Sequence, residues 1–369
     1  MAGFDEVFED LDDPRTGNAK RHLLHEVLVI ALCAVLCGGE NCADMALFGR
    51  SKRAFLQEFL RLEHGIPSHD TFSRVFRLLD PAAFHGWFLG FMRRFAETCQ
   101  GVIAIDGKTM RRSFDRASAA SPLHLVSAWA ADQRLVLGQI AVDDKSNEII
   151  AVPKLLELLS LTGCVVTADA MSCQRKIAQQ VVDQGGDYVL ALKGNQETLH
   201  DDVRRFLDDP ETVLTSATDT DKGHGRIEIR TASLTTDIAW LLEDHHWPGL
   251  TAIGKITASR EIDGRTGSDT RYYLLSTALT PESFNAAVRS HWGVENQLHW
   301  RLDVIMDEDQ ARNRKDHGPE NLALLRKLVL NLAKLEPSKA SLRGKLKQAG
   351  WDNAFLAQIL TQFVNLQMR

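Results

Sequence analysis

Hydrophobic positions over roughly the first hundred residues recur with the spacing of helices. An apolar run over residues 23–37 ends at a pair of glycines, which is a typical helix end. In the stretch IPSHDTFSRVFRLL, Ser68 is a suitable N-cap for a helix whose apolar residues recur at helical intervals: Phe72, Val75, Phe76 and Leu79. With the preceding SKRAFLQEFL (51–60), this helix resembles a helix-turn-helix. Such a pair either packs as an ordinary helical unit or reads DNA.

From residue 101 onward, short apolar runs alternate with amphipathic stretches. The runs VIAID, LHLVSAWA and RLVLGQIAV predict three strands, of which the second and third form a hairpin. Two further strand-like runs, CVVTADA and DYVLALKGN, alternate with three helical stretches. The resulting order, βββαβαβα, predicts an α/β fold in which helices flank a mixed sheet.

Two later changes of pattern complete the division of the chain. Residues 210–280 contain three strand-like runs between polar loops, which we interpret as a β-rich insertion. Helices resume at Thr280, a cap followed by Pro281 in the first turn, and continue along the rest of the sequence. The predicted parts are an acidic tail (1–19), an all-α N-terminal domain (20–98), a core in two pieces (99–209 and 281–335), the insertion (210–280) and a helical C-terminal segment (336–369).

The composition is that of an ordinary globular protein. Of its 369 residues, 44% are hydrophobic and 25% are charged, and the longest apolar run, residues 27–37, is too short to cross a bilayer. The acidic start MAGFDEVFEDLDD lacks the basic region of a signal peptide. None of the six cysteines forms a CxxC pair. We therefore expect a cytoplasmic protein with reduced cysteines and no membrane partner.

The net charge of −6 taken alone argues weakly against nucleic acid as a partner. Its distribution changes that view, because residues 1–13 carry six acids and no Lys or Arg, so the remainder of the chain is neutral. Residues 312–347 carry ten Lys or Arg against three acids, a net of +7. This stretch is a candidate basic surface, and a solvated helix face is the alternative.

Two aspartates end the first and fourth predicted strands. Asp106 follows VIAI and Asp169 follows CVVTA. The strand order places the first strand at the centre of the sheet with the fourth beside it and parallel, so both aspartates should meet at one edge. Two like charges held close together raise the free energy unless a cation or a shared proton offsets them. Taken singly, each Asp is as readily a turn former or a helix cap.

The stretch RSHWGVENQLHW, residues 289–300, supplies a third acid. Four polar residues recur at intervals of four and so share one helix face: His291, Glu295, His299 and Asp303. We expect Trp292 and Trp300 to anchor this helix in the core. If the helix packs against the sheet edge, Glu295 joins the two aspartates, and three carboxylates suit a hard cation such as Mg²⁺. Two such ions can clamp the attacking and leaving oxygens of a phosphodiester.

The two histidines of this stretch do not predict a zinc site. His291 and His299 are eight residues apart, which corresponds to about 12 Å of helix rise, too far for one ion. We expect them either to hydrogen-bond a substrate backbone or to support Glu295, and plain helix packing is the alternative.

Basic and polar side chains near these acids are candidates for phosphate contacts, which need no sequence reading. Individually, each such residue is more often simply exposed on the surface. The candidates are Lys108, Arg111, Arg112, Lys193, His224, Arg226, Arg289, His291, Asn296 and His299.

Five motifs in this order resemble those of bacterial insertion-sequence transposases, in the group that includes the H-repeat-associated proteins: AIDGKTMRRS, VVTADAMSCQ, YVLALKGNQ, GHGRIEIR and RSHWGVENQLHWRLDVIMDEDQARNR. The resemblance implies a ribonuclease H-like core with a DDE triad at Asp106, Asp169 and Glu295. It implies that the triad binds Mg²⁺, for which Mn²⁺ can substitute. It also implies cleavage at transposon ends, 3′-hydroxyl transfer into target DNA, and a homodimer on double-stranded DNA, associated with the nucleoid when bound.

One feature departs from the broader class. Its pattern Tyr-x2-Arg-x3-Glu-x6-Lys falls here on Val288, His291, Glu295 and Leu302, so only the glutamate matches. The groups that hold a cleaved 5′ end, and a hairpin intermediate, are therefore not predicted. Should Glu295 not be the third acid, Glu308 is the next candidate. The alternative functions are an inactive or domesticated DNA-binding protein and a metal-dependent nuclease without strand transfer.

Overall fold

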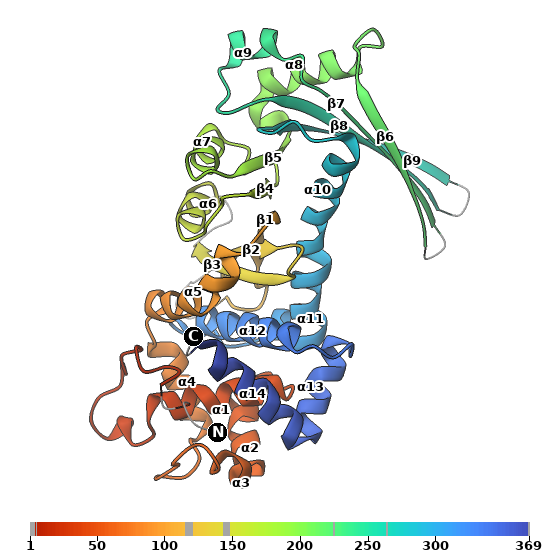
Figure 1. The fold of residues 1–369 in the computed structure, drawn as a ribbon. Coiled ribbons are helices and arrows are strands. Elements are labelled where there is room, and N and C mark those ends of the chain that lie inside the picture. The colour runs from red at the N-terminus through yellow and green to blue at the C-terminus, as the bar shows by residue number, and fades with distance from the viewer. Residues whose placement is uncertain are drawn as a thin grey trace.

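A nine-stranded mixed sheet organises the fold, with the strand order β3-β2-β1-β4-β5-β9-β8-β7-β6 (Figure 1). The computed structural model describes residue 4 and the ranges 6–114, 121–142, 148–223, 226–262 and 265–367. The strands are β1 (Gly101–Thr109), β2 (His124–Ala130), β3 (Leu135–Val142), β4 (Cys164–Ala168), β5 (Asp187–Leu192), β6 (Thr215–Gly223), β7 (Arg226–Thr235), β8 (Ala252–Ile262) and β9 (Arg265–Leu275).

The first five strands confirm the predicted βββαβαβα order. β1 pairs antiparallel with β2 and parallel with β4, and β4 pairs parallel with β5. β2 and β3 form the predicted hairpin. The centre of β1 is fully buried because helices cover both faces of the sheet, as its continuous apolar run VIAI requires. This topology agrees with the ribonuclease H-like core that the sequence motifs imply.

The helices fall into groups that follow the chain. The N-terminal group is α1 (Leu24–Leu36), α2 (Cys42–Ser51), α3 (Arg53–Leu56), α4 (His69–Leu78) and α5 (Pro81–Glu97), after the short η1 (Gly17–Lys20). Between and after the strands lie α6 (Glu148–Glu157), α7 (Arg175–Asp183), η3 (Gly194–Gln196), α8 (Glu197–Asp208) and α9 (Ala239–His245). The remaining elements are α10 (Pro281–Gly293), η4 (Val294–His299), α11 (Trp300–Met306), η5 (Glu308–Gln310), α12 (Gly318–Leu335), α13 (Leu342–Trp351) and α14 (Asn353–Gln367).

Helices cover the sheet on both faces and at the β3 end. α6 and α7 lie on one side of the central strands and α10 on the other (Figure 1). α5 and α12 pack against β3, and α12 also packs on α1 and α4. Nearly all of α12 is buried, so this helix joins the sheet to the N-terminal and C-terminal helices. Among the described residues, no helix is both long and apolar enough to span a membrane.

The insertion extends the same sheet. β9 pairs antiparallel with β5, and β8, β7 and β6 follow outward. Three of its strands were predicted, whereas β6 and α9 were not. The Phe284 ring of α10 packs over Gly254 in β8, where an added Cβ would lie 2.8 Å from the ring. α10 therefore runs from the insertion strands to the central strands and connects the two.

The predicted acidic tail is not a free tail. Its apolar side chains are buried in the helical core: Phe4, Val7, Phe8 and Leu11. The indole nitrogen of Trp87 in α5 donates a hydrogen bond to the carbonyl oxygen of Val7 at 2.6 Å. The acids between them, including Glu9 and Asp10, remain exposed. The apolar residues recur at intervals of three and four, so the segment behaves as an amphipathic piece of the N-terminal domain.

The basic stretch 312–347 is only partly a surface. Arg326 and Lys327 of α12 and Lys345 of α13 are buried. The Lys327 ammonium donates to Ser127 Oγ at 2.9 Å and to Gln139 Oε1 at 2.6 Å. Three of the ten cations thus serve the core, because buried charges need hydrogen-bonded partners that an exposed charge does not.

The predicted helix-turn-helix is confirmed only in its second helix. Ser68 caps α4, and its hydroxyl accepts a hydrogen bond from the backbone N–H of Thr71 at 3.3 Å. The first predicted helix, 51–60, is reduced to the single turn α3, and α4 packs instead on α2 and α1. DNA reading by this unit stays a prediction.

Candidate active site

The two strand aspartates lie side by side because of the β1–β4 register. Ile105 and Ala168 are the last residues paired between these parallel strands, so the next residue on each strand is an aspartate. Asp106 and Asp169 line one cavity of about 490 Å³. The predicted convergence at this edge is therefore confirmed, although β1 itself continues beyond Asp106 in antiparallel pairing with β2.

Each aspartate has a distinct environment. Asp169 accepts a hydrogen bond from the backbone N–H of Ser172 at 3.1 Å, in the turn after β4. Asp106 is more enclosed, with 18% of its side chain exposed. Its Oδ2 atom is buried and has no hydrogen-bond partner among the described residues. An unsatisfied buried carboxylate oxygen of this kind fits a cation ligand.

Glu295 reaches the same cavity from the helical side. Thr280 caps α10, as predicted, and accepts from the backbone N–H of Ser283 at 3.2 Å. The helix then widens into the π-helical η4, which contains Glu295 and ends at His299. π-helical turns inside α-helices are rare and are frequent at functional sites. Glu295 is half-exposed, whereas His299 is buried.

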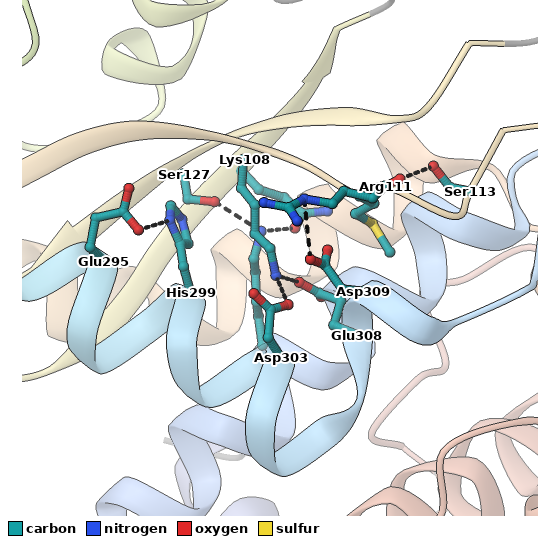
Figure 2. Close-up of polar contacts among 12 residues, drawn as sticks. Lys108, Arg111, Ser113, Ser127, Glu295, His299, Asp303, Glu308 and Asp309 are labelled. Carbon is teal, nitrogen blue, oxygen red and sulfur yellow. Dashed lines mark hydrogen bonds and ion pairs between the residues drawn. The ribbon is translucent and has the colours of Figure 1, made fainter.

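His299 connects the helix acid to the strand acid. Its Nδ1 atom lies 3.4 Å from Asp106 Oδ2. The same atom lies 3.6 Å from Glu295 Oε2, a contact that Figure 2 shows. Oxygen or nitrogen atoms of Asp106, Glu295 and His299 all lie within 4.8 Å of one another, close enough to hold one metal ion. The expectation that a histidine supports Glu295 thus has a defined geometry at His299.

The acids perturb one another. The pKa of Asp106 is raised to about 6, mainly by burial; the nearby Glu295 and Asp169 add to the rise and His299 opposes it. Contact with the His299 imidazole lowers the pKa of Glu295. Without a cation, Asp106 therefore keeps its proton to a higher pH than an ordinary aspartate does. Asp106, Glu295 and His299 could together hold one divalent metal ion, which would offset the repulsion between the carboxylates, and Asp169 lines the same cavity.

The first His-Trp pair shows which groups anchor the helix. His291 Nδ1 lies 3.1 Å from the Thr167 hydroxyl on β4, two residues before Asp169. Burial lowers the pKa of His291. Trp292 and Trp300 are 41% and 54% exposed, so the expectation that they anchor the helix in the core is wrong. The buried stripe contains the histidines, and the tryptophans lie one position beyond it on the open side.

The candidate phosphate ligands divide into enclosed and accessible residues. Lys108 is buried, and its ammonium contacts Asp303 and Glu308. Arg289 pairs with Asp219 at 2.8 Å and Asp221 at 3.0 Å on β6. Neither is a free phosphate ligand in this structure. Glu308, the alternative third acid, is excluded from the cavity lining because its carboxylate is buried against Lys108.

Four other candidates are exposed: Arg111, Arg112, Lys193 and Asn296. Lys193 lines the cavity with the acids. Arg226 is the first residue of β7, and His224 lies outside the described residues. Arg111 Nε lies 3.8 Å from Asp309 Oδ2 but its side chain is 84% exposed, so it remains accessible to a large ligand together with the other three exposed residues.

The sequence did not predict that the insertion lines one side of the cavity that contains the acids. Arg271 and Tyr273 of β9 line the acid cavity together with Trp292, and the Arg271 guanidinium lies 5.0 Å from the centre of the Trp292 ring. The same three residues border a neighbouring cavity of about 760 Å³, where Arg230 and Arg260 also lie. The acids thus face a cleft whose far side is arginine-rich and aromatic. The motif GHGRIEIR contains only Arg230 of these arginines, and the position of the insertion strands in the sheet was not predictable from spacing.

Gly107 has a steric role beside Asp106. Thr109 Oγ1 lies 2.7 Å from His124 Nδ1, and His124 Nε2 lies 2.5 Å from Glu148 Oε1. An added Cβ at Gly107 would lie 2.3 Å from that glutamate oxygen. The glycine after the aspartate therefore allows the buried His124–Glu148 pair to close over β1.

The fold and the site together define the class of this protein: a mixed sheet in which two aspartates at strand ends and one glutamate on a helix line the same cleft. Residues 97–332 match the family described as the transposase DDE domain, and residues 6–92 match its associated domain. The chain belongs to the DDE transposase family, which confirms the resemblance seen in its motifs. Membership supports a role in transposition and a divalent metal at the acidic cluster.

Individual relatives agree with the family. The chain is 39% identical over 352 residues to the "H repeat-associated putative transposase YhhI" of Escherichia coli K12, and the match covers 92% of each chain. It is 44% identical over 279 residues to the "Uncharacterized protein in dhlA 3'region" of Xanthobacter autotrophicus, with 74% of this chain and 94% of that protein covered. Among solved structures, a piggyBac transposase synaptic complex with hairpin DNA matches with a TM-score of 0.42 and 11% identity, over 100% of this chain and 77% of the other.

Proposed function

We propose that the protein is an active DDE transposase that cleaves DNA at transposon ends and joins the freed 3′-hydroxyl to target DNA. The observation that carries the proposal is the convergence of Asp106, Asp169 and Glu295 on one cleft, with a buried Asp106 oxygen that has no hydrogen-bond partner among the described residues. An inactive descendant would be under no physical constraint to keep three mutually repelling acids together.

In this proposal the three acids hold Mg²⁺, or Mn²⁺ in its place. When bound, the metal polarises the scissile phosphate and favours the ionised form of the attacking hydroxyl. Asp106 and Asp169 provide fixed carboxylates at the sheet edge, and Glu295 provides a carboxylate from the helix. His299 keeps Glu295 and Asp106 within contact distance, and His291 anchors the same helix to β4.

A basic surface next to the acids gives duplex DNA a path. Arg111 and Arg112 are exposed just past β1, and the Arg314 guanidinium donates to the Arg112 carbonyl oxygen at 2.9 Å. Arg314 and Lys315 also line a cavity of about 270 Å³ against Arg77 of α4. The accessible part of the basic stretch therefore continues from the sheet edge toward the N-terminal helices. Phosphates along this surface would position the duplex without reading its sequence.

The test is a joining reaction. The protein is incubated with Mg²⁺, a target plasmid and labelled DNA that carries the sequences flanking its gene, and products are resolved on a denaturing gel. We expect nicked end DNA followed by end DNA joined to plasmid. Cleavage without joined product would indicate a nuclease, and binding without cleavage would indicate an inactive DNA-binding protein. Light scattering of the complex tests the proposed homodimer on DNA.

A further inference from the structure

Lys108 is the only described lysine that lies on β1, and it is enclosed rather than open to solvent. It follows Asp106 by two residues, so both side chains lie on the same face of the strand. Its side chain is 12% exposed. The ammonium contacts Asp303 of α11, and Glu308 Oε2 of η5 accepts from it at 2.8 Å. A phosphate could reach this ammonium only by displacing two carboxylates.

The contacts of Asp106 and Lys108 form two successive links between β1 and the helix that carries Glu295. In the first link, His299 lies beside Asp106. In the second link, Asp303 lies beside Lys108, as Figure 2 shows. Two residues along a strand advance about 6.7 Å, and four residues along a helix advance about 6 Å. The step from Asp106 to Lys108 therefore matches the step from His299 to Asp303, and both links form without distortion.

Buried residues hold the link between Lys108 and Asp303 in place. Glu308 is 1% exposed at the side chain, and it follows Asp307, whose φ of 51° turns the chain sharply after α11. Lys327 of α12 is also buried, and its ammonium donates to Ser127 on β2 and to Gln139 on β3. Buried charges with several partners resist displacement, because breaking one pair leaves an uncompensated charge.

We infer that Lys108 is a positioning residue: its buried ion pairs with Asp303 and Glu308 hold the Glu295 helix at the distance from Asp106 that metal binding requires. The inference rests on the proposed function and deepens it, because it assigns Lys108 to the metal site instead of to DNA. Its ammonium pairs with Asp303 and Glu308, not with Asp106 or Glu295. It acts on the site chiefly through α11, and its positive charge also favours the ionised form of Glu295.

The experiment uses Mn²⁺ without DNA. It measures the Mn²⁺ concentration at which the rise in melting temperature of the full chain is half-maximal. Lys108→Met should raise that concentration by about tenfold or more, as is typical when a residue supporting metal ligands is lost. Lys108→Arg should recover part of the loss, because it keeps a cation between the two carboxylates. Asp303→Asn, which keeps the shape of its side chain, should also weaken Mn²⁺ binding.

The exposed Lys193, on the same cavity, supplies the matched control. Lys193→Met should leave the Mn²⁺ concentration unchanged and lower the salt dependence of DNA binding by about one charge. Lys108→Met should raise the half-saturating Mn²⁺ concentration and leave the salt dependence of DNA binding unchanged. If Lys108→Met binds Mn²⁺ like the unmodified protein and instead loses one charge of salt dependence, Lys108 is a DNA ligand and the inference is wrong.

Two further outcomes separate the inference from the proposed function. If the unmodified protein shows no Mn²⁺-dependent stabilisation, the metal site itself fails. If it does, and Glu295→Gln abolishes the effect while all three Lys108 and Asp303 variants retain it, only the positioning role fails. Should Lys108→Met not fold, Lys108→Arg and Asp303→Asn decide the question, and unchanged Mn²⁺ binding in both overturns the inference.

Discussion

His299 Nδ1 lies 3.4 Å from Asp106 Oδ2, although the two residues are 193 positions apart in the sequence. The contact connects the helix that carries Glu295 to the strand that carries Asp106. The histidine is buried, and its other carboxylate neighbour is Glu295. The site is thus assembled by the packing of η4 against β1, and each prediction below perturbs one part of that assembly.

The first prediction concerns the triad. Asp106→Asn, Asp169→Asn and Glu295→Gln should each abolish cleavage of end DNA while a cooperative melting transition and DNA affinity are retained, because each change removes a charge and keeps the shape. A plasmid-joining gel, a melting curve and a filter-binding titration measure the three properties. Cleavage by Glu295→Gln at the unmodified rate would show that the helix acid is not a metal ligand.

The second prediction concerns pH and metal. The raised pKa of Asp106, about 6, means that in EDTA its protonated form stabilises the fold below pH about 4, and this contribution is lost as pH rises through about 6. The melting temperature of Asp106→Asn should therefore rise relative to that of the unmodified protein between pH 5 and pH 7. Millimolar Mn²⁺ should stabilise the unmodified protein more at pH 7 than at pH 5, because metal and proton compete for the same carboxylate.

A 100-fold excess of Mn²⁺ over its dissociation constant corresponds to about 2.7 kcal/mol of stabilisation. A melting curve at pH 7 that does not respond to Mn²⁺ would contradict a shared metal site. The Asp106→Asn variant serves as the control, since it should show little metal response at either pH.

The third prediction concerns the DNA path. Neutralising Arg111 and Arg112 together should weaken binding to all sequences and reduce the salt dependence by roughly two charges. The control Lys176→Gln/Arg205→Gln removes two exposed cations from α7 and α8 and should leave the slope unchanged. An unchanged slope for the Arg111/Arg112 variant would mean that DNA does not pass the end of β1.

The fourth prediction concerns the N-terminal segment. Phe8 is 1% exposed and its ring centre lies 4.5 Å from that of Trp87, so Phe8→Ala should cost about 3–5 kcal/mol of unfolding free energy. Deleting residues 1–13 should destabilise the helical domain for the same reason. The exposed Glu9→Gln/Asp10→Asn variant should change stability little, which a chemical denaturation series would establish. If the deletion melts like the full chain, the segment does not belong to the core.

Sequence alone determined the parts whose signal is local. Apolar runs of strand length and the alternation with helices predicted the βββαβαβα order, and the rule for parallel strand ends placed Asp106 and Asp169 together. The cap at Thr280 located the start of the helix that carries Glu295. These features follow from periodicity and from backbone chemistry within a few residues.

Only the tertiary structure decided which side chains face the site and which are enclosed. The His-Trp pairs have the same spacing whichever residue is buried. In the structure His299 is buried and His291 half-buried, whereas both tryptophans are exposed. Lys108 resembles a phosphate ligand until Asp303 and Glu308, 195 and 200 positions away, fold against it. Burial and charge compensation depend on partners distant in sequence, so no local pattern of residues contains them.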